Sequence, residues 1–551
     1  MAAAPDIPAV KRAGLPADLA RLAAEGDGWL TPEDRYALKT HGVCAQAQPG
    51  VFMVRIRVPG GRVTPAQARA VAALADAHGE SWVHVTTRQS LELHHVAARS
   101  VPSVLAACDA LGLTNRSACG HTHRNVMSCP DAGVGLDEPF DCGPDARAVA
   151  AAVVARAAEL NVVLPSRVNL AFGGCPACAD HARLNDGGFQ SVVVDGQAGY
   201  RLWAGGSLGT APFVGVPLAD FVPRRHVLAA TLALTEAFVD LGDLDNPKKG
   251  RMKFVIEAHG ADAFRAAWRE RFARLAAAPA FVPEPVGVPD GARLAEILAH
   301  RPDGGWGHGV RPQLTPGLAL VTVNVPLGDL TGDELRVLAD LAPFGDGHLY
   351  TTRNQNVQLR DVPVARVAEL TAGLASVGLS LEAADTSLDV RACTGSAVCA
   401  LAISAAPVAG VRIAASPALA RSGGLRVHVS GCPNSCAQHQ AADIGLSGGK
   451  VRINGVTRVG YTLLVGADLA AGRLAEPIGR VAEEDVEPAV TGVIGAWEAV
   501  RHPGERLVET IDRVGAAVFG SHVATIAAGF EAGPAPVAPP LPAPERSPAV
   551  A

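Results

Sequence analysis

Residues 52–64, FMVRIRVPGGRVT, have a counterpart in residues 319–331, ALVTVNVPLGDLT, and this pair decides the fold. Each stretch alternates apolar and other residues in the way that a half-buried strand does, and each then reaches a proline, a short turn and a threonine. Gln67 or Glu334 follows three residues after the closing threonine, which is the spacing of a capping box. The sequence therefore predicts that a helix begins after each threonine.

The order of elements after these stretches is also the same in both copies. Each predicted helix ends at a glycine, a second strand follows, and a second amphipathic helix comes next. In chain order the paired elements are the helices 65–79 and 332–345, the strands 82–93 and 348–359, and the helices near 101–111 and 364–376. This strand–helix–strand–helix order, repeated over about 60 residues, predicts two copies of one α+β unit.

The repeat continues more faintly into a cysteine-bearing region. Residues 172–188, FGGCPACADHARLNDGG, resemble residues 429–445, VSGCPNSCAQHQAADIG, although the first copy has one residue fewer between its cysteines. We therefore place the two halves of the chain at about 50–300 and 310–525, joined by the Pro-rich residues 278–291.

Composition describes a globular protein with several cores. The chain has 551 residues, of which 48% are hydrophobic and 19% charged, and its formal net charge is -6. This charge, and the lack of basic blocks with interleaved aromatics, argue against a nucleic-acid partner. The first residues lack the apolar core of a signal peptide, and no apolar run is long enough to span a bilayer. We expect no membrane partner and a cytoplasmic location.

Four of the eleven cysteines form two close pairs. Cys393 and Cys399 have the spacing C-x5-C, and after 32 residues Cys432 and Cys436 have the spacing C-x3-C. An odd total of cysteines without a secretion signal argues against a disulfide framework. Spacers of five and three residues fit a zinc knuckle poorly, so the residues themselves favour a [4Fe–4S] site, with zinc second and four unrelated buried thiols third.

The segments CTGSAVC and GCPNSC resemble those of the sirohaem-containing nitrite and sulfite reductases. The likeness extends to FMVRIRVPGG, TTRQ, RNVMSCP, NDGGF, GGSLG, RMKF and QHQAADIGL, and covers residues 35–520. The resemblance implies an α+β, pseudo-twofold duplicated fold with ferredoxin-like half-domains and two sirohaem/cluster-type α/β domains. The expected segments are half-domains at 45–115 and 310–380, haemoprotein domains at 116–300 and 381–525, and a disordered Pro/Ala-rich tail at 531–551.

The resemblance also implies the cofactors. Cys393, Cys399, Cys432 and Cys436 match the residues that hold a [4Fe–4S] cluster in the family, and Cys436 matches the cysteine that also bridges to the sirohaem iron. Asn434 matches a residue that contacts sirohaem, although asparagine between two cysteines is also a common turn residue.

A set of basic residues matches the anion pocket of the family. Arg88 and Arg124 correspond to two pocket cations, while Asn354 occupies the Arg88 register in the second copy. In LPSRVNL, Arg167 replaces a lysine of the family pattern, and Asn169 occupies a position where asparagine is typical of assimilatory nitrite reductases. Arginine does not readily donate a proton near neutral pH, so proton delivery through water, or a different substrate, is expected.

Three cysteines and one basic segment have less specific interpretations. Cys175 and Cys178 resemble an altered copy of the cluster loop, with no further ligands nearby in the sequence. Cys129 is interpreted first as a buried thiol and second as a pocket thiol. Residues 246–254, NPKKGRMKF, are expected either to meet cofactor carboxylates or an acidic electron carrier, or to form a solvated loop.

The resemblance implies a six-electron reduction of nitrite to ammonia or of sulfite to sulfide. No G-x-G-x-x-G follows a predicted strand, so the electrons are expected from a separate ferredoxin or flavoprotein. Two alternatives are a precorrin-3B synthase-like oxygenase of cobalamin synthesis and a non-catalytic iron–sulfur electron-transfer module.

Overall fold

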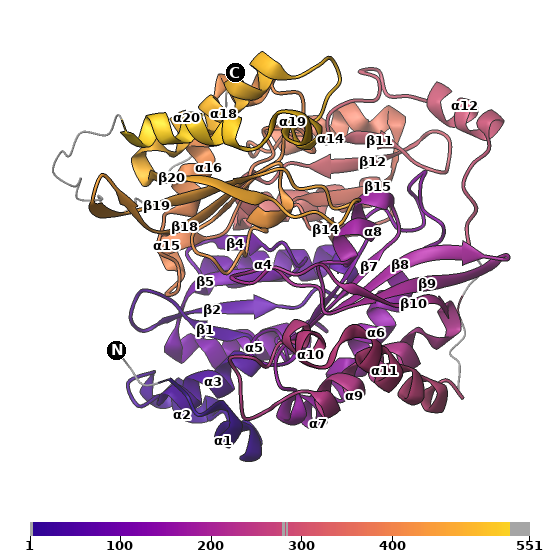
Figure 1. The fold of residues 1–551 in the computed structure, drawn as a ribbon. Helices are drawn as coiled ribbons and strands as arrows, with labels where there is room; N and C mark the ends of the chain where they lie inside the picture. The colour runs from indigo at the N-terminus through magenta and orange to yellow at the C-terminus, as the bar shows by residue number, and fades with distance from the viewer. Residues whose placement is uncertain (1–3, 278–281, 283–284, 529–551) are drawn as a thin grey trace. The chain divides into compact units, whose positions relative to one another are not determined.

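The computed structural model describes residues 4–277, 282 and 285–528, and it divides into two compact units (Figure 1). The first unit ends at Gly373 and the second begins at Leu374. Most of the predicted linker 278–291 is described, except for 278–281 and 283–284, whereas the predicted tail at 531–551 lies outside the described residues.

Two five-stranded sheets of the first unit contain the repeated half-domains. Their strand orders are β1–β2–β5–β4–β13 and β11–β12–β15–β14–β3. The strands of the first copy are β1 (Val43–Ala45), β2 (Val51–Ile56), β3 (Arg62–Val63), β4 (Trp82–Val85) and β5 (Leu91–Ala97). Those of the second copy are β11 (Val310–Pro312), β12 (Leu318–Val323), β13 (Asp329–Thr331), β14 (Leu349–Thr351) and β15 (Val357–Pro363). Because β13 pairs with β4 and β3 pairs with β14, each copy completes the sheet of the other.

The predicted helices of both copies are present. Thr64 and Thr331 each accept a hydrogen bond from the third residue of the helix that follows, and complete capping boxes confirm both expected helix starts. The four helices are α4 (Pro65–His78), α5 (Val101–Ala110), α13 (Gly332–Leu341) and α14 (Val367–Ala375). The second helix of each copy is therefore also confirmed.

The predicted single strands 82–93 and 348–359 are wrong, because each forms an antiparallel hairpin instead. The chain reverses at Gln89, with φ of 60°, and at Gln355, with φ of 68°. In the first copy, β4 and β5 leave this turn side by side, and β14 and β15 do the same in the second copy. A left-handed glutamine is rare, so neither composition nor periodicity indicated the turn.

The third sheet of the first unit has the order β10–β9–β8–β7–β6. Its strands are β6 (His123–Ser128), β7 (Val168–Gly173), β8 (Gly187–Val194), β9 (Gln197–Ala204) and β10 (Val216–Pro223). The first three strands are parallel and the last two are antiparallel. Phe172 of β7 stacks on Phe189 of β8 at 4.5 Å between ring centroids, inside a large buried core.

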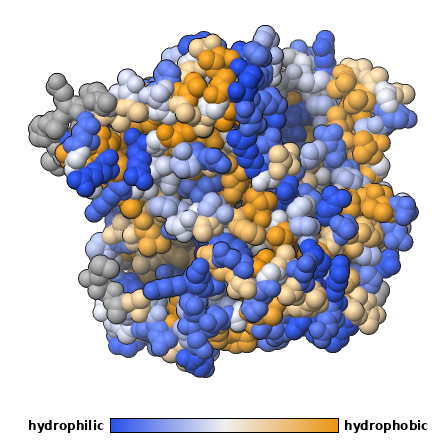
Figure 2. All heavy atoms as spheres, in the orientation of Figure 1, coloured by the Kyte–Doolittle hydropathy of each residue, from blue (hydrophilic) through white to orange (hydrophobic). Residues whose placement is uncertain are grey.

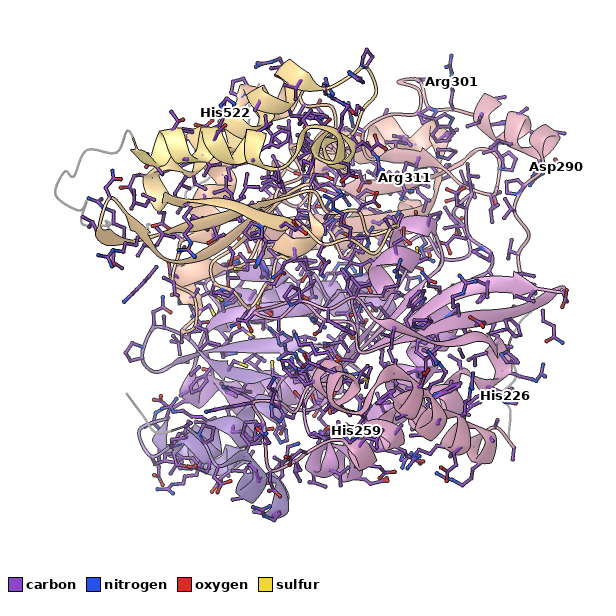
Figure 3. All side chains as sticks on the ribbon, viewed as in Figure 1. His226, His259, Asp290, Arg301, Arg311 and His522 are labelled. Atoms are coloured by element: carbon purple, nitrogen blue, oxygen red, sulfur yellow. The ribbon has the colours of Figure 1, made fainter. Side chains whose placement is uncertain are left out.

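One group of helices accompanies this sheet, and another group forms the beginning of the chain (Figure 1). The helices that accompany the third sheet are α6 (Gly143–Ala155), α7 (Ala157–Val163), α8 (Pro176–Ala182), α9 (Val227–Leu241), α10 (Met252–His259) and α11 (Ala261–Leu275). The N-terminal helices are α1 (Ile7–Arg12), α2 (Leu19–Glu25) and α3 (Pro32–Thr40), and α12 (Gly291–Ala299) follows the described part of the linker. Figure 3 labels His226, which caps α9, and His259, the last residue of α10.

The second unit contains one sheet of the same design, in the order β16–β17–β18–β19–β20. Its strands are β16 (Arg391–Ala392), β17 (Val427–Ser430), β18 (Ile444–Ile453), β19 (Val456–Val465) and β20 (Glu476–Ala482). Again the first three strands are parallel and the last two antiparallel. The helices are α15 (Gly395–Val398), α16 (Ala406–Ala414), α17 (Pro417–Arg421), α18 (Val486–Val500), α19 (Leu507–Val514) and α20 (Ala517–Ala528). The fold is therefore the duplicated α+β fold that the sequence predicts.

The surface mixes polar and apolar side chains. On the face in view, Figure 2 shows small patches of hydrophobic residues among hydrophilic residues. No helix in the described part of the chain has both the length and the apolar composition that a bilayer span requires.

Two glycines of β18 provide a test of the packing. A Cβ on Gly445 would lie 2.0 Å from the His439 carbonyl oxygen, whereas a Cβ on Gly449 would meet no atom within 4 Å. We expect Gly445→Ala to lower the free energy of unfolding by about 1–3 kcal/mol, because backbone has to move. Gly449→Ala should leave it almost unchanged. Urea denaturation of both variants measures the difference, and equal midpoints would contradict the described approach of β18 to the loop before it.

Candidate active site and metal centre

Three polar residues lie at the amino ends of the parallel strands in the first unit. Arg124 is the second residue of β6, Asn169 is the second residue of β7, and Asp186 directly precedes β8. Because the three strands are parallel neighbours, their amino ends form one edge of the sheet. The sequence separates these residues, but the strand order brings them together.

Arg88 reaches the site from the hairpin turn between β4 and β5. Asn125 of β6 donates a hydrogen bond to the Arg88 carbonyl oxygen at 2.9 Å, which joins the turn to the sheet. The Arg88 amide donates to the Thr86 hydroxyl at 3.3 Å, and the Asn354 amide makes the same bond to Thr352 at 3.2 Å. These matching bonds support the predicted register of Arg88 and Asn354.

The predicted arginines lie near one another around Arg167. The positive charge of Arg251, burial, and then the charges of Arg124 and Arg88 lower the pKa of Arg167, while Asp186 acts in the opposite direction. Arg251 itself forms an ion pair with Asp186, with Nη2 at 3.0 and 3.2 Å from the two carboxylate oxygens. Four guanidinium groups therefore share this edge, and Arg251 enters from the predicted basic segment 246–254.

Asn169 is fixed on the same carboxylate. Its backbone N–H and its side-chain Nδ2 both donate to Asp186 Oδ2, each at 2.9 Å. Its Oδ1 atom is buried and has no hydrogen-bond partner among the described residues. An amide oxygen in this position is available to accept a hydrogen bond from a ligand or from water.

Lys11, His121 and Lys253 also belong to this region, and only Lys253 lies in a segment that the sequence marked as basic. Burial, followed by the charges of Lys11, Arg124 and Arg167, lowers the pKa of His121 to about 3, so the ring is neutral. Burial also lowers the pKa of Lys11 to about 7, and burial together with Arg251 lowers that of Lys253 to about 8. Lys11 comes from α1, far away in sequence, and no motif marked it.

The basic segment 246–254 is exposed in its first part and buried in its second. Lys248 and Lys249 are exposed, whereas Lys253 is buried and Arg251 is largely so. A concentration of buried cations is unfavourable unless anions offset it, and Asp186 supplies one negative charge. The amino edge therefore suits a ligand with several negative charges, such as the carboxylates of a tetrapyrrole together with an oxyanion.

The four predicted cluster cysteines come together within the second unit. Cys393 directly follows β16, Cys399 caps α15, and Cys432 and Cys436 lie in the loop after β17. β16 and β17 are parallel, so both loops leave the carboxyl edge of the sheet. Burial raises the pKa of Cys393 to about 12, and the neighbouring Cys436 and Cys432 add to this rise.

The surroundings of these sulfurs fit an iron–sulfur cluster. The Gly431 amide donates to Cys393 Sγ at 3.2 Å, and Asn434 hydrogen-bonds to Cys432 through its backbone and side chain. A Cβ on Gly431 would lie 2.7 Å from the Ser404 carbonyl oxygen, so the close approach requires glycine. The four thiols are close enough to influence one another, since, besides burial, Cys436 and Cys432 raise the pKa of Cys393, and Cys399 raises that of Cys432.

Cys129, Cys175 and Cys178 form a second group of cysteines, in the first unit. The sulfurs of Cys129, Cys175 and Cys178 all lie within 4.8 Å of one another. Cys129 is fully buried, in agreement with its first interpretation, but it contacts Cys175. The expectation that Cys175 and Cys178 have no further ligand nearby is wrong, because the ligand comes from the end of β6.

Comparison with known proteins gives matches over most of the chain. The family described as the nitrite/sulfite reductase ferredoxin-like half domain matches residues 45–111 and 311–377, and the nitrite and sulphite reductase 4Fe-4S domain matches 119–275 and 384–529. A ferredoxin–nitrite reductase of Synechococcus elongatus is 33% identical over 458 residues, which cover 80% of this chain and 85% of that protein.

Two other relatives extend the comparison. A ferredoxin–nitrite reductase of Leptolyngbya laminosa is 30% identical over 83% of this chain and 88% of its own length. A sulfite reductase [ferredoxin] of Mycolicibacterium paratuberculosis is 28% identical over 72% of this chain and 70% of its own length. The structure of the Mycobacterium tuberculosis NirA protein superposes with a TM-score of 0.80 at 23% identity, covering 94% of this chain and 97% of that one, and shows the shared fold.

Lys11 provides a test of the electrostatics. Its pKa falls from 10.5 to about 7 on folding, so between these values the unfolded chain binds more protons than the folded one. The free energy of unfolding should therefore rise with pH above 7, by up to about 1.4 kcal/mol per pH unit from this group. Lys11→Met should remove that rise, whereas the exposed Lys39→Met should keep it. Denaturation midpoints from pH 7 to pH 10 measure the slope, and equal slopes in all three proteins would contradict a buried, uncharged Lys11.

Proposed function

The chain belongs to the nitrite and sulfite reductase family, and we propose that it reduces nitrite to ammonia with electrons from ferredoxin, with sulfite reduction to sulfide as the second candidate. The observation that carries the proposal is the convergence of Arg88, Arg124 and Arg167 with Arg251 at one sheet edge. A small oxyanion and a polycarboxylate cofactor both require such fixed positive charge.

Two observations favour nitrite over sulfite. Asn169 occupies the position at which asparagine resembles assimilatory nitrite reductases, and its free Oδ1 presents an acceptor rather than a second cation. The two relatives with 30% identity or more that are described above are both ferredoxin–nitrite reductases. Nitrite carries one negative charge and sulfite two, so fewer cations suffice to hold nitrite.

Sirohaem and a [4Fe–4S] cluster are the cofactors of this family. When bound, these groups would supply single electrons for the reduction of the anion. We assign the cluster to Cys393, Cys399, Cys432 and Cys436, and Cys436 would also help to hold sirohaem. The Gly431 amide supports the thiolate of Cys393 with a hydrogen bond.

The side chains of the amino edge have separate tasks. Arg88, Arg124 and Arg167 hold the oxyanion and stabilise negative charge as its oxygens leave as water. Asp186 orients Arg251 and Asn169 through its two carboxylate oxygens. Together these residues provide a preorganised anion site.

Protons come from groups other than Arg167, because arginine holds its proton at working pH. Burial lowers the pKa of Lys11 to about 7 and, with Arg251, that of Lys253 to about 8, so each ammonium Nζ can give up a proton near neutrality. We assign proton supply to these lysines, with water carrying protons to the anion.

Because the relatives named above are ferredoxin-dependent and no span is found in the described residues, we also place the reaction in the cytoplasm.

The direct test is steady-state kinetics of purified protein with reduced ferredoxin, supplied with nitrite and with sulfite separately. We expect ammonia from nitrite, with the higher kcat/KM. A sirohaem-loaded protein that reduces neither anion would contradict the proposal. An absorption spectrum without sirohaem bands would instead support the electron-transfer alternative.

Arg124→Gln tests the anion site. Removing one charged hydrogen-bond donor should lower kcat/KM for nitrite about 10- to 100-fold, which corresponds to about 1.5–3 kcal/mol. Arg225→Gln, at an exposed arginine of the same unit, is the matched control and should retain activity. Equal kinetics in both variants, at equal sirohaem content, would remove Arg124 from the site.

Asn169→Lys tests the choice of substrate. A further cation at position 169 should raise the ratio of sulfite to nitrite kcat/KM by about tenfold, since a dianion gains more from added charge. The control is Asn246→Lys, which adds the same charge in an exposed loop. If the ratio stays unchanged, the position does not determine specificity.

A further inference from the structure

The carboxyl edge of the first unit's parallel sheet carries a group of thiols that the proposed reaction does not use. Cys129 directly follows β6, and Cys175 and Cys178 follow β7, so they lie at the edge opposite to the arginines. The three sulfurs lie within 4.8 Å of one another, and those of Cys129 and Cys175 are 3.4 Å apart. Three thiols in such a small volume are unusual in a core without a bound metal.

The strand registers show that this group occupies the position of the cluster cysteines in the other copy. In the first unit Met127, Ala171 and Gly188 are paired across three strands, and in the second unit Arg391, His428 and Gly445 are paired in the same way. Counting along the chain from these pairs makes Cys129 equivalent to Cys393, and Cys175 equivalent to Cys432. The two sheets therefore present thiols at the same edge.

Glu138 occupies the fourth position. It lies in the loop after Cys129, as Cys399 lies in the segment after Cys393, and its side chain is fully buried. Its Oε1 atom accepts hydrogen bonds from Cys129 Sγ at 2.8 Å and from the Cys175 amide at 2.7 Å. Its Oε2 atom has no hydrogen-bond partner among the described residues.

The local backbone admits this carboxylate only because residue 174 is glycine. A Cβ at Gly174 would lie 1.5 Å from Glu138 Oε2. A buried carboxylate that lacks a partner on one oxygen is costly unless a cation binds it. Arg353 hydrogen-bonds to the Cys178 thiol, so one positive charge already faces the group.

We propose that Cys129, Cys175, Cys178 and Glu138 bind one divalent zinc ion. Three sulfurs and one oxygen are a tetrahedral ligand set that a borderline-soft dication accepts. A zinc site with bonds of about 2.3 Å requires sulfurs about 3.8 Å apart, and the sulfurs of this compact group, all within 4.8 Å of one another, meet this requirement. The two copies thus hold different metal centres at equivalent edges.

The experiment uses the cofactor-loaded protein, purified without chelator from zinc-supplemented medium. Elemental analysis should find about one zinc per chain in addition to the iron of the cluster. Zinc-edge X-ray absorption should show three sulfur neighbours at about 2.3 Å and one oxygen at about 2.0 Å. Because this readout concerns zinc alone, it is independent of nitrite or sulfite reduction.

Three variants locate the ion. Cys178→Ser should lose at least nine-tenths of the zinc and keep its iron and sirohaem, while Cys108→Ser, at a buried thiol of α5, should keep all three. Glu138→Gln retains the thiols, and zinc should pass to a colorimetric chelator about tenfold faster than from the unchanged protein. This variant tests the site even if Cys178→Ser fails to fold.

Several outcomes would overturn the proposal. They are less than a tenth of an equivalent of zinc in the unchanged protein, full zinc content in Cys178→Ser, or a four-sulfur zinc shell. A disulfide between two of the three thiols, seen by mass spectrometry of the freshly purified protein, would also overturn it.

Discussion

Parallel pairing of three strands, repeated in two sheets, determines where the candidate ligands at the strand ends lie. Parallel neighbours align their amino ends at one edge and their carboxyl ends at the other. In the first unit this brings Arg124, Asn169 and Asp186 to the amino edge and Cys129 to the carboxyl edge. In the second unit it places the loop of Cys393 beside the loop that follows β17. A shift in either register would separate the ligands without changing the core composition.

The amino edge of the first unit concentrates positive charge on half-buried arginines, where water screens it only in part. Arg167 has its pKa lowered first by Arg251, and His121 is held neutral by burial and by the cations around it. Such an arrangement reduces stability in the absence of a ligand and binds anions strongly in return. The pKa values of Lys11 and Lys253 fall to about 7 and about 8 in these surroundings. Both lysines are therefore suitable proton carriers near neutral pH, whereas Arg167 is not.

The sequence predicted the features that depend on local chemistry and internal likeness. Capping boxes, paired helices and the duplication were visible in it because each depends on short-range spacing. The turn at Gln89 was not visible, since a left-handed glutamine has no compositional signal. Lys11 and Glu138 were also missed, because each joins its site from a distant or unremarkable segment and only the tertiary fold brings it there. The pocket arginines were predicted through family resemblance, because a single arginine is more commonly part of a surface ion pair.

At the amino edge of the sheet the two copies share a carboxylate but differ in the residue that faces it. In the first copy the Asn169 amide donates to Asp186 at 2.9 Å, and in the second the Arg426 amide donates to Asp443 at 2.8 Å, so the carboxylate is a shared structural anchor. Arg426 also forms an ion pair with Asp443 through its own side chain, which neutralises that edge. In the first copy an amide occupies this position, and the carboxylate forms an ion pair with Arg251 instead. The anchored carboxylate therefore holds the sheet in both copies, and the residue opposite it determines which arginine it pairs with.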